Sequence, residues 1–177
     1  MDVLPCTEWE DSMKARVKIS RVILAAVALV PCLANGQSLL SERNISLNAA
    51  SEMATASLDR CRADGYKVTI TVLNRHARTA LVLSDDGASP HTIENSMRKA
   101  YTAFTTRAPS GDMSKRPEPL LRGFLLLEKL TVLEGGLPIF AGKELIGSIG
   151  VSGSPGGDKD AACAKAGIDK IAKKLAE

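Results

Sequence analysis

Residues 144–167, ELIGSIGVSGSPGGDKDAACAKAG, place a glycine-rich stretch between an apolar segment and an alanine-rich segment. The apolar part is typical of a β-strand, and the part that follows Asp158 is typical of an α-helix. Many nucleotide-binding proteins hold a phosphate with a strand, a glycine loop and a helix in this order. The first question is therefore whether the chain binds a nucleotide.

The glycine spacing argues against both common nucleotide motifs. A P-loop has a lysine followed by serine or threonine directly after its glycines, and no such pair follows here. A dinucleotide site has GxGxxG within a parallel βαβ unit, whereas the neighbouring segments predict antiparallel strands. We interpret Gly147 and Gly150 as relief of crowding within a strand, and residues 153–157 as a turn. The start of the next helix still offers free amide groups to an anion.

The segments upstream predict a helix, a hairpin and a second helix. Ser46 is placed to cap a helix with one apolar stripe, and Gly65 is placed to end it. Alternation over residues 66–73 predicts a half-buried strand, and residues 79–83 predict the strand that returns beside it. Pro90 suits the start of the second helix.

The segments downstream complete an α+β pattern. We expect a long exposed loop over residues 106–119 and a short helix or buried connector over 120–130. Three strands should follow, over 131–136, 137–140 and 144–153. Asp158 or Asp160 should then cap a final helix that extends to Leu175. Short connections between strands favour an antiparallel sheet, here of about five strands with helices packed on it.

The amino terminus predicts a cleaved signal peptide over residues 1–36. Four basic residues precede the apolar run that starts at Val22, and Ala34-Asn35-Gly36 fits a small-x-small cleavage site. Met13 is an alternative start, because the signal peptide then has an ordinary length. A retained anchor and a lipoprotein are weaker alternatives, since the apolar run is short and Pro31 precedes Cys32. Residues 37–177 are then one domain without a stable membrane anchor, in the periplasm or secreted.

Charge and cysteine content narrow the partners. The formal net charge of +3 argues against a dedicated nucleic-acid surface. Cys61 and Cys163 remain after signal cleavage, in a compartment that is oxidising. If the first and last helices pack antiparallel, these cysteines form a disulfide; two buried thiols are the alternative. Neither a zinc-site spacing nor a GxSxG nucleophile motif is present in the sequence.

The run GGLPIFAGKELIGSIGVSG, followed by Asp158 and the alanine-glycine helix, resembles the GlcG/HbpS family, also called the haem-degrading domain family. The carboxy-terminal domain of PduO-type proteins belongs to the same family. The resemblance extends over residues 46–175 and includes VTITVLN and the Lys99-Ala100 helix. The family's usual aspartate after the first strand is Asn74 here, which weakens any role that needs a carboxylate there.

The resemblance implies a profilin-like, three-layer α/β/α sandwich that forms homo-oligomers. Family members are linked to haem binding, and some to haem degradation. The lead hypothesis is therefore an exported haem-binding protein that stores, senses or weakly degrades haem. The alternatives are a binding module for a small organic hydroxy acid, whose carboxylate Lys99 and the glycine turn would hold, and an oligomeric accessory protein without a ligand.

Two segments contain the candidate haem-binding residues. His76 is the favoured iron ligand over His91, because Arg75 and Arg78 beside it suit haem propionates. A solvated turn is the alternative for this segment.

The second segment is the second predicted helix. Lys99 and Thr102 are three residues apart on a helix, so both are expected to face a pocket. Tyr101 is a second candidate ligand of ferric haem, with core packing as its alternative.

Overall fold

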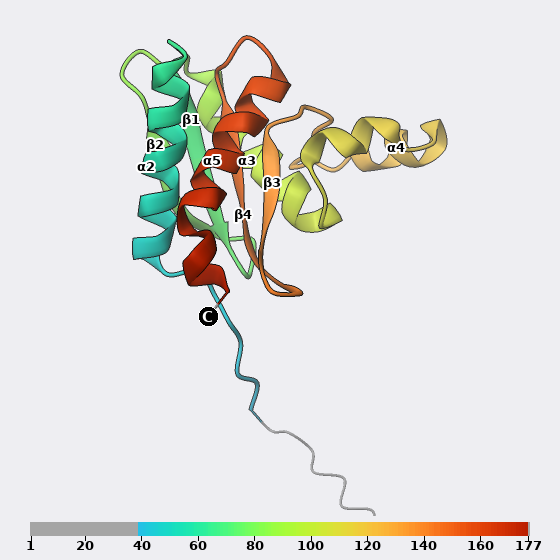
Figure 1. Ribbon diagram of the computed structural model, residues 1–177. Helices are drawn as coiled ribbons and strands as arrows, with labels where there is room; N and C mark the ends of the chain where they lie inside the picture. Colours follow the sequence, from blue (N-terminus) through green and yellow to red (C-terminus); the bar gives the residue numbers. More distant parts are fainter. Residues whose placement is uncertain (1–38, 177) are drawn as a thin grey trace, which may run out of the picture. The chain divides into compact units, whose positions relative to one another are not determined.

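A computed structural model describes residues 39–176, and one antiparallel sheet in the order β2-β1-β4-β3 forms the centre of this part of the chain (Figure 1). The predicted signal peptide lies outside the described residues. The strands are β1 (Thr69–Asn74), β2 (Thr79–Ser84), β3 (Gly136–Ala141) and β4 (Glu144–Ser152). The helices are α2 (Leu47–Ala63), α3 (His91–Thr106), the 3-10 helix η1 (Ser110–Lys115), α4 (Glu118–Leu125) and α5 (Gly157–Leu175).

Helices cover both faces of the sheet, which confirms the predicted α+β class. Helices α2 and α5 lie side by side on one face (Figure 1), where Val68, Ile70 and Val72 join their apolar residues in the main core. Helix α3 packs on the other face, against β1, β3 and β4. The sheet has four strands within residues 39–176, rather than about five.

Strand β1 is buried on both faces, although alternation predicted only one buried face. The threonines on its second face are fully buried because α3 covers them with hydroxyl groups. Thr69 Oγ1 lies 2.8 Å from Thr92 Oγ1, and Thr71 Oγ1 lies 2.8 Å from Ser96 Oγ. These hydrogen bonds satisfy polar groups that would otherwise be costly to bury. The alternation of apolar and polar residues therefore predicted an exposed face where β1 has a polar but buried one.

Two glycines allow α3 to approach the sheet closely. A Cβ atom on Gly150 would collide with the backbone of Ser96 and lie 2.6 Å from the Ala100 nitrogen. A Cβ atom on Gly136 would collide with the Lys99 carbonyl group. The prediction that Gly150 relieves crowding is confirmed, and the crowding comes from a helix backbone.

The predicted strand over residues 131–136 is not a strand. Side chains occupy the backbone groups that a neighbouring strand would need: the Thr131 amide donates to Thr102 Oγ1 at 3.0 Å. The Ser110 hydroxyl donates to the Leu133 carbonyl at 2.7 Å and accepts from the Gly136 amide at 2.9 Å. Only Gly136 of this segment enters the sheet, as the first residue of β3.

The segment before it forms short helices that leave apolar surface exposed. Helix η1 lies within the predicted loop over 106–119, and α4 is the short helix expected over 120–130. Helix α4 has no buried residue and extends away from the sheet (Figure 1). Its exposed apolar surface continues into the following turn and comprises Leu120, Leu125, Leu126 and Leu127.

A disulfide joins α2 and α5, the two helices that cover one face of the sheet. Cys61 of α2 and Cys163 of α5 are bonded, with their Cα atoms 5.6 Å apart and a sequence separation of 102. Of the two alternatives that the sequence left open, the structure has the disulfide. Within residues 39–176, no helix is both long enough and apolar enough to cross a membrane.

Candidate functional site

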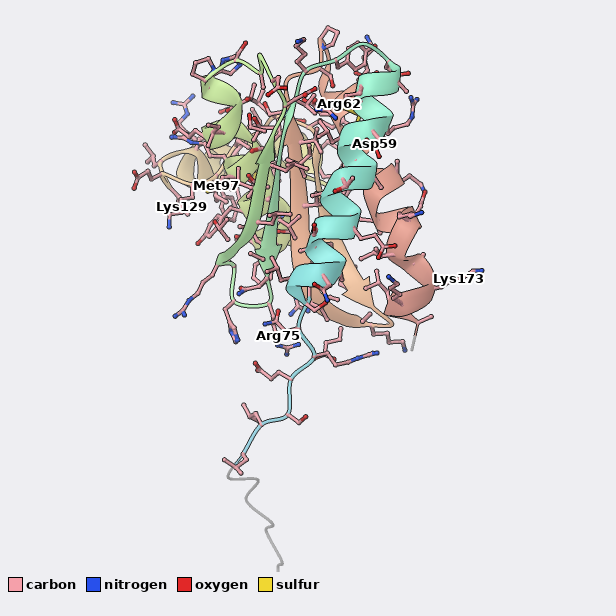
Figure 2. All side chains as sticks on the ribbon, turned by 90° about the vertical axis from the view of Figure 1, so that its left-hand side faces the viewer. Asp59, Arg62, Arg75, Met97, Lys129 and Lys173 are labelled. Atoms are coloured by element: carbon pink, nitrogen blue, oxygen red, sulfur yellow. A yellow bond between two sulfur atoms is a disulfide. The ribbon has the colours of Figure 1, made fainter. Side chains whose placement is uncertain are left out.

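Two of the three predicted residues of the β1–β2 turn, Arg75 and His76, lie beside the carboxylate of Glu42. Arg75 lies at the end of the sheet (Figure 2). Its guanidinium is paired with the carboxylates of Glu42, at 3.3 Å, and Glu144. The His76 side chain is 58% exposed, and its Nε2 lies 3.7 Å from the Glu42 carboxylate. The guanidinium of Arg75 is therefore already neutralised, and His76 lines neither the cavity at Lys99 nor the groove at Tyr101.

Asn74 organises this turn in place of the aspartate that the family has there. Its Oδ1 accepts from the amides of His76, at 2.9 Å, and Arg78, at 3.1 Å. Ala77 adopts a left-handed conformation with φ of 55°. A neutral amide oxygen therefore performs the structural role, and no carboxylate is needed for it.

Thr102 does not face a pocket, contrary to the prediction that paired it with Lys99. Its side chain is fully buried, and its Oγ1 accepts the Thr131 amide proton. On an α-helix, three residues correspond to about 300° of rotation, so a narrow pocket can contact one side chain and miss the other. The hydroxyl of Thr102 fixes the connector before β3.

Tyr101 borders an apolar groove beside the segment that follows α4. The groove has a volume of about 310 Å³. Lys129 lies over the tyrosine, with Nζ 5.5 Å from the ring centroid. The remaining lining residues are Thr105, Leu127, Glu128 and Leu130. The groove thus combines a phenol, an ammonium group, a carboxylate and apolar surface.

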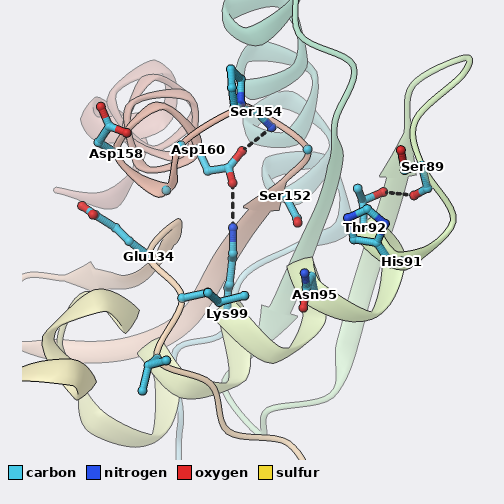
Figure 3. A pocket seen from close by; sticks show the side chains of 16 residues that line it. Ser89, His91, Thr92, Asn95, Lys99, Glu134, Ser152, Ser154, Asp158 and Asp160 are labelled. Carbon is cyan, nitrogen blue, oxygen red and sulfur yellow. Dashed lines mark hydrogen bonds and ion pairs between the residues drawn. The ribbon is translucent and has the colours of Figure 1, made fainter.

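Lys99 borders a separate and more polar cavity of about 460 Å³ (Figure 3). Its ammonium group lies 2.6 Å from Asp160 Oδ2 and donates to the Val151 carbonyl at 3.0 Å. The other oxygen of Asp160 accepts the Ser154 amide proton at 3.0 Å. The remaining lining comes from the α3 start, the connector before β3 and the glycine-rich turn: Ser89, His91, Thr92, Asn95, Val132, Leu133, Glu134, Ser152, Gly153, Pro155, Gly156, Gly157 and Asp158.

Sequence reasoning gave Asp160 a different role. Asp158 or Asp160 was expected to cap the last helix, whereas Gly156 is the N-cap residue and Asp160 is buried against Lys99. Ser152 belongs to the family run GVSG but was given no role as a site residue, and Asn95 gave no signal because asparagine is common on any surface. His91, which the sequence ranked below His76, borders the cavity. Within residues 39–176, no cluster of three or more histidine, cysteine or acidic residues is placed to hold a metal ion.

A family model described as "Haem degrading protein HbpS-like" matches residues 45–169. Among curated proteins, Protein GlcG of Escherichia coli K12 is 29% identical over 108 residues, which cover 61% of this chain and 81% of GlcG. An uncharacterised 15.0 kDa protein from the dhaT-dhaS intergenic region of Citrobacter freundii is 30% identical over 113 residues, covering 62% and 80% of the two chains.

Solved structures show the same fold. A double mutant of Streptomyces reticuli HbpS is 32% identical, with a TM-score of 0.71 over 78% of this chain and 94% of that chain. A Klebsiella pneumoniae protein, ORFY, is 25% identical, with a TM-score of 0.71 over 76% and 95%. A PduOC–haem complex is 22% identical, with a TM-score of 0.66 over 72% and 94%, and this likeness concerns the fold alone.

Proposed function

Because the chain belongs to the HbpS-like family of haem degrading proteins, we propose that it is an exported haem-binding protein. The family match over residues 45–169 is the observation that carries this proposal. The disulfide between Cys61 and Cys163 supports export, since structural disulfides persist mainly in oxidising compartments. Storage, sensing or weak degradation of haem are the roles that such binding would serve.

The Tyr101 groove fits haem better than the His76 turn does. Haem is a flat apolar group with an iron atom and two carboxylates, so it needs apolar cover, an axial ligand and cations. Tyr101 supplies a phenol oxygen, Lys129 supplies a cation, and Leu127 and Leu130 supply apolar surface. At the turn, Arg75 is already paired with two carboxylates, and His76 lies in the open. Tyr101 is therefore our preferred iron ligand, and His76 is the alternative.

A second copy of the chain would complete the cover. A groove of about 310 Å³ is at the small end of ligand pockets, so it would enclose only part of a haem. The exposed leucines of α4 lie next to the groove in sequence, and leucines exposed in this number are typical of interaction surfaces. Haem-dependent association, measured by sedimentation velocity with and without haem, tests this part of the proposal.

A charge placed in the groove tests the site. Leu127→Asp puts a carboxylate beside the apolar lining residues, and the matched control Val82→Asp puts one on an exposed position of the edge strand β2. A haem titration of residues 37–177, followed by the Soret band, should show saturable binding that Leu127→Asp weakens and Val82→Asp leaves unchanged. Equal effects of both variants, or saturation unaffected by either, would contradict the groove as the haem site.

A further inference from the structure

The cavity at Lys99 is a second site, distinct from the haem groove, and the proposal for it goes beyond haem binding. It lies between the start of α3, the end of β4 and the first turn of α5 (Figure 3). Its volume of about 460 Å³ is within the range of small-molecule sites. No residue lines both this cavity and the Tyr101 groove.

Polar groups in the cavity wall are left without protein partners. Ser152 is only 3% exposed, and its hydroxyl makes no hydrogen bond to any residue between 39 and 176. Figure 3 shows this hydroxyl on the cavity side of β4, with the amide of Asn95 also in the wall and without a hydrogen bond to the residues drawn. Within residues 39–176, the fully enclosed polar side-chain atoms without a partner are Ser57 Oγ and Arg98 Nε, so the Ser152 hydroxyl is open to the cavity and can bond a molecule bound there.

Lys99 also retains hydrogen-bonding capacity toward the cavity. An ammonium group has three N–H donors, and Lys99 uses one for Asp160 and one for the Val151 carbonyl. A side chain at position 135 would fill the space beside this pair, because a Cβ atom on Gly135 would lie 2.7 Å from Asp160 Cβ and 3.0 Å from Lys99 Nζ. The backbone at Gly135 therefore packs directly against this ion pair, and Lys99 itself lines the cavity.

The charge of the lining disfavours an anionic ligand. Three carboxylates and one ammonium group line the cavity, which gives a formal charge of minus two with His91 neutral. Asp160 neutralises Lys99, and neither Glu134 nor Asp158 has an ion pair within residues 39–176. The carboxylate of Asp158 also lies against Gly156, at the positive end of α5 that an anion would otherwise approach.

We propose that this cavity binds a small, neutral, polyhydroxylated molecule of about monosaccharide size. Each hydroxyl group of such a ligand both donates and accepts, which suits a wall that mixes both kinds of group. Lys99 and Asn95 donate, Glu134 and Asp158 accept, and Ser152 does both. The carboxylate group of a hydroxy acid accepts only and carries a negative charge, so it would be repelled by Glu134 and Asp158. This assignment replaces the small organic acid that the sequence suggested for Lys99.

Two probes of equal chain length test the charge argument. Xylitol and xylonate each have five carbons, but only xylonate carries a carboxylate. In amide-resolved NMR titrations of residues 37–177, xylitol should produce saturable shifts at Ser152, Ser154 and Asn95, and xylonate should bind more weakly. No saturable shift with xylitol or with glucose, up to the solubility of each, would overturn the proposal. Tighter binding of xylonate than of xylitol would overturn the ligand class.

Variants assign the contacts. Ser152→Ala and Asn95→Ala should each weaken xylitol binding by about 2- to 10-fold, since one hydrogen bond contributes about 0.5–1.5 kcal/mol. Ser114→Ala is the matched control, because Ser114 is exposed, bonds the Gly111 carbonyl and does not line the cavity. Glu134→Gln should raise xylonate binding relative to xylitol. Unchanged binding in both Ser152→Ala and Asn95→Ala would contradict this site.

The haem proposal and this proposal fail separately. Haem titration of Ser152→Ala should match that of the unmodified chain, because Ser152 does not line the Tyr101 groove. Xylitol binding that persists in Leu127→Asp would likewise be independent of haem. Circular dichroism and thermal melts of each variant establish that it is folded before binding is compared.

Discussion

Lys99 Nζ lies 2.6 Å from Asp160 Oδ2, and the two side chains are only 5% and 3% exposed. This ion pair connects α3 to the first turn of α5 across the end of β4. Lys99→Met would leave the Asp160 carboxylate buried without its partner, so it should lower the free energy of unfolding by about 3–5 kcal/mol. Urea denaturation at pH 7 measures the loss.

An exposed lysine provides the control for that loss. Lys143 lies in the turn between β3 and β4, so Lys143→Met should change the stability by no more than about 0.5 kcal/mol. Adding Asp160→Asn to Lys99→Met removes the stranded charge and should recover part of the stability. Equal losses for Lys99→Met and Lys143→Met would show that the buried pair does not stabilise the fold.

Reduction of the disulfide should lower the stability of the fold and change the environment of residues that line the Lys99 cavity. A cross-link that closes a loop of about 100 residues contributes up to about 4.7 kcal/mol, so the double variant Cys61→Ser, Cys163→Ser should lose about 2–5 kcal/mol. The Ser154 hydroxyl lies 3.6 Å from Cys61 Sγ, and the Ser154 amide donates to Asp160. We therefore expect the NMR amide signals of Ser154 and Asp160 to shift on reduction. If reduction shifted only the amide signals of residues in α2, this would contradict the coupling between the disulfide and the cavity.

A pair of glycine substitutions tests why α3 packs so closely. Gly150→Ala introduces a Cβ atom that meets the α3 backbone, so it should destabilise the protein by about 1–3 kcal/mol. Gly123 lies in α4 with nothing within 4 Å of the added atom, so Gly123→Ala should increase helix stability by up to about 1 kcal/mol. Thermal melts compare the two. A neutral Gly150→Ala would mean that α3 shifts without cost.

Asp85 gives the stability a component that depends on pH. The hydrogen bond from the Arg62 guanidinium lowers the pKa of the Asp85 carboxyl below its ordinary value. A lowered folded-state pKa contributes stability above the unfolded-state pKa of about 3.9, and this is lost as the pH falls through the folded-state value. Asp85→Asn should therefore lower the melting temperature at pH 7 and have less effect in strong acid.

The neighbouring aspartate is the control for this pH dependence. Asp86 has no ion pair within residues 39–176, so Asp86→Asn should change the melting temperature little at either pH. A deficit of Asp85→Asn that persists unchanged at acid pH would exclude the ion pair as its source.

The sequence predicted the elements whose pattern is local. The stripe after Ser46, the alternation in β1 and the glycine motif before α5 identified the helices, the sheet and the family. The role of Asp160 was not predictable in this way, because its partner Lys99 is 61 residues away and its position also suits a helix cap. The alternation places Thr69 and Thr71 on an exposed face because they are polar. The hydroxyl groups of α3 that cover them are distant in the sequence, so the alternation contains no information about them.

For the candidate sites, the sequence likewise identified suitable residue types but not the cavity that each side chain borders. Lys99 and Tyr101 were identified as residue types suited to ligands, but they are two positions apart on a helix and so face different cavities. Thr102 was assigned to a pocket from its spacing, and tertiary contact with Thr131 determines its role instead. The segments that pack against α3 determine which cavity each side chain borders, and spacing along the helix does not specify them.

Haem titration of residues 37–177, compared with that of Tyr101→Phe and His76→Ala, tests whether the protein binds haem and which side chain ligates the iron. Tyr101→Phe removes only the phenol oxygen, and His76→Ala removes an exposed imidazole outside the groove. We expect a saturable, stoichiometric Soret change that Tyr101→Phe alters and His76→Ala preserves. A change that His76→Ala abolishes would move the site to the β1–β2 turn, and the absence of any saturable change would contradict haem binding.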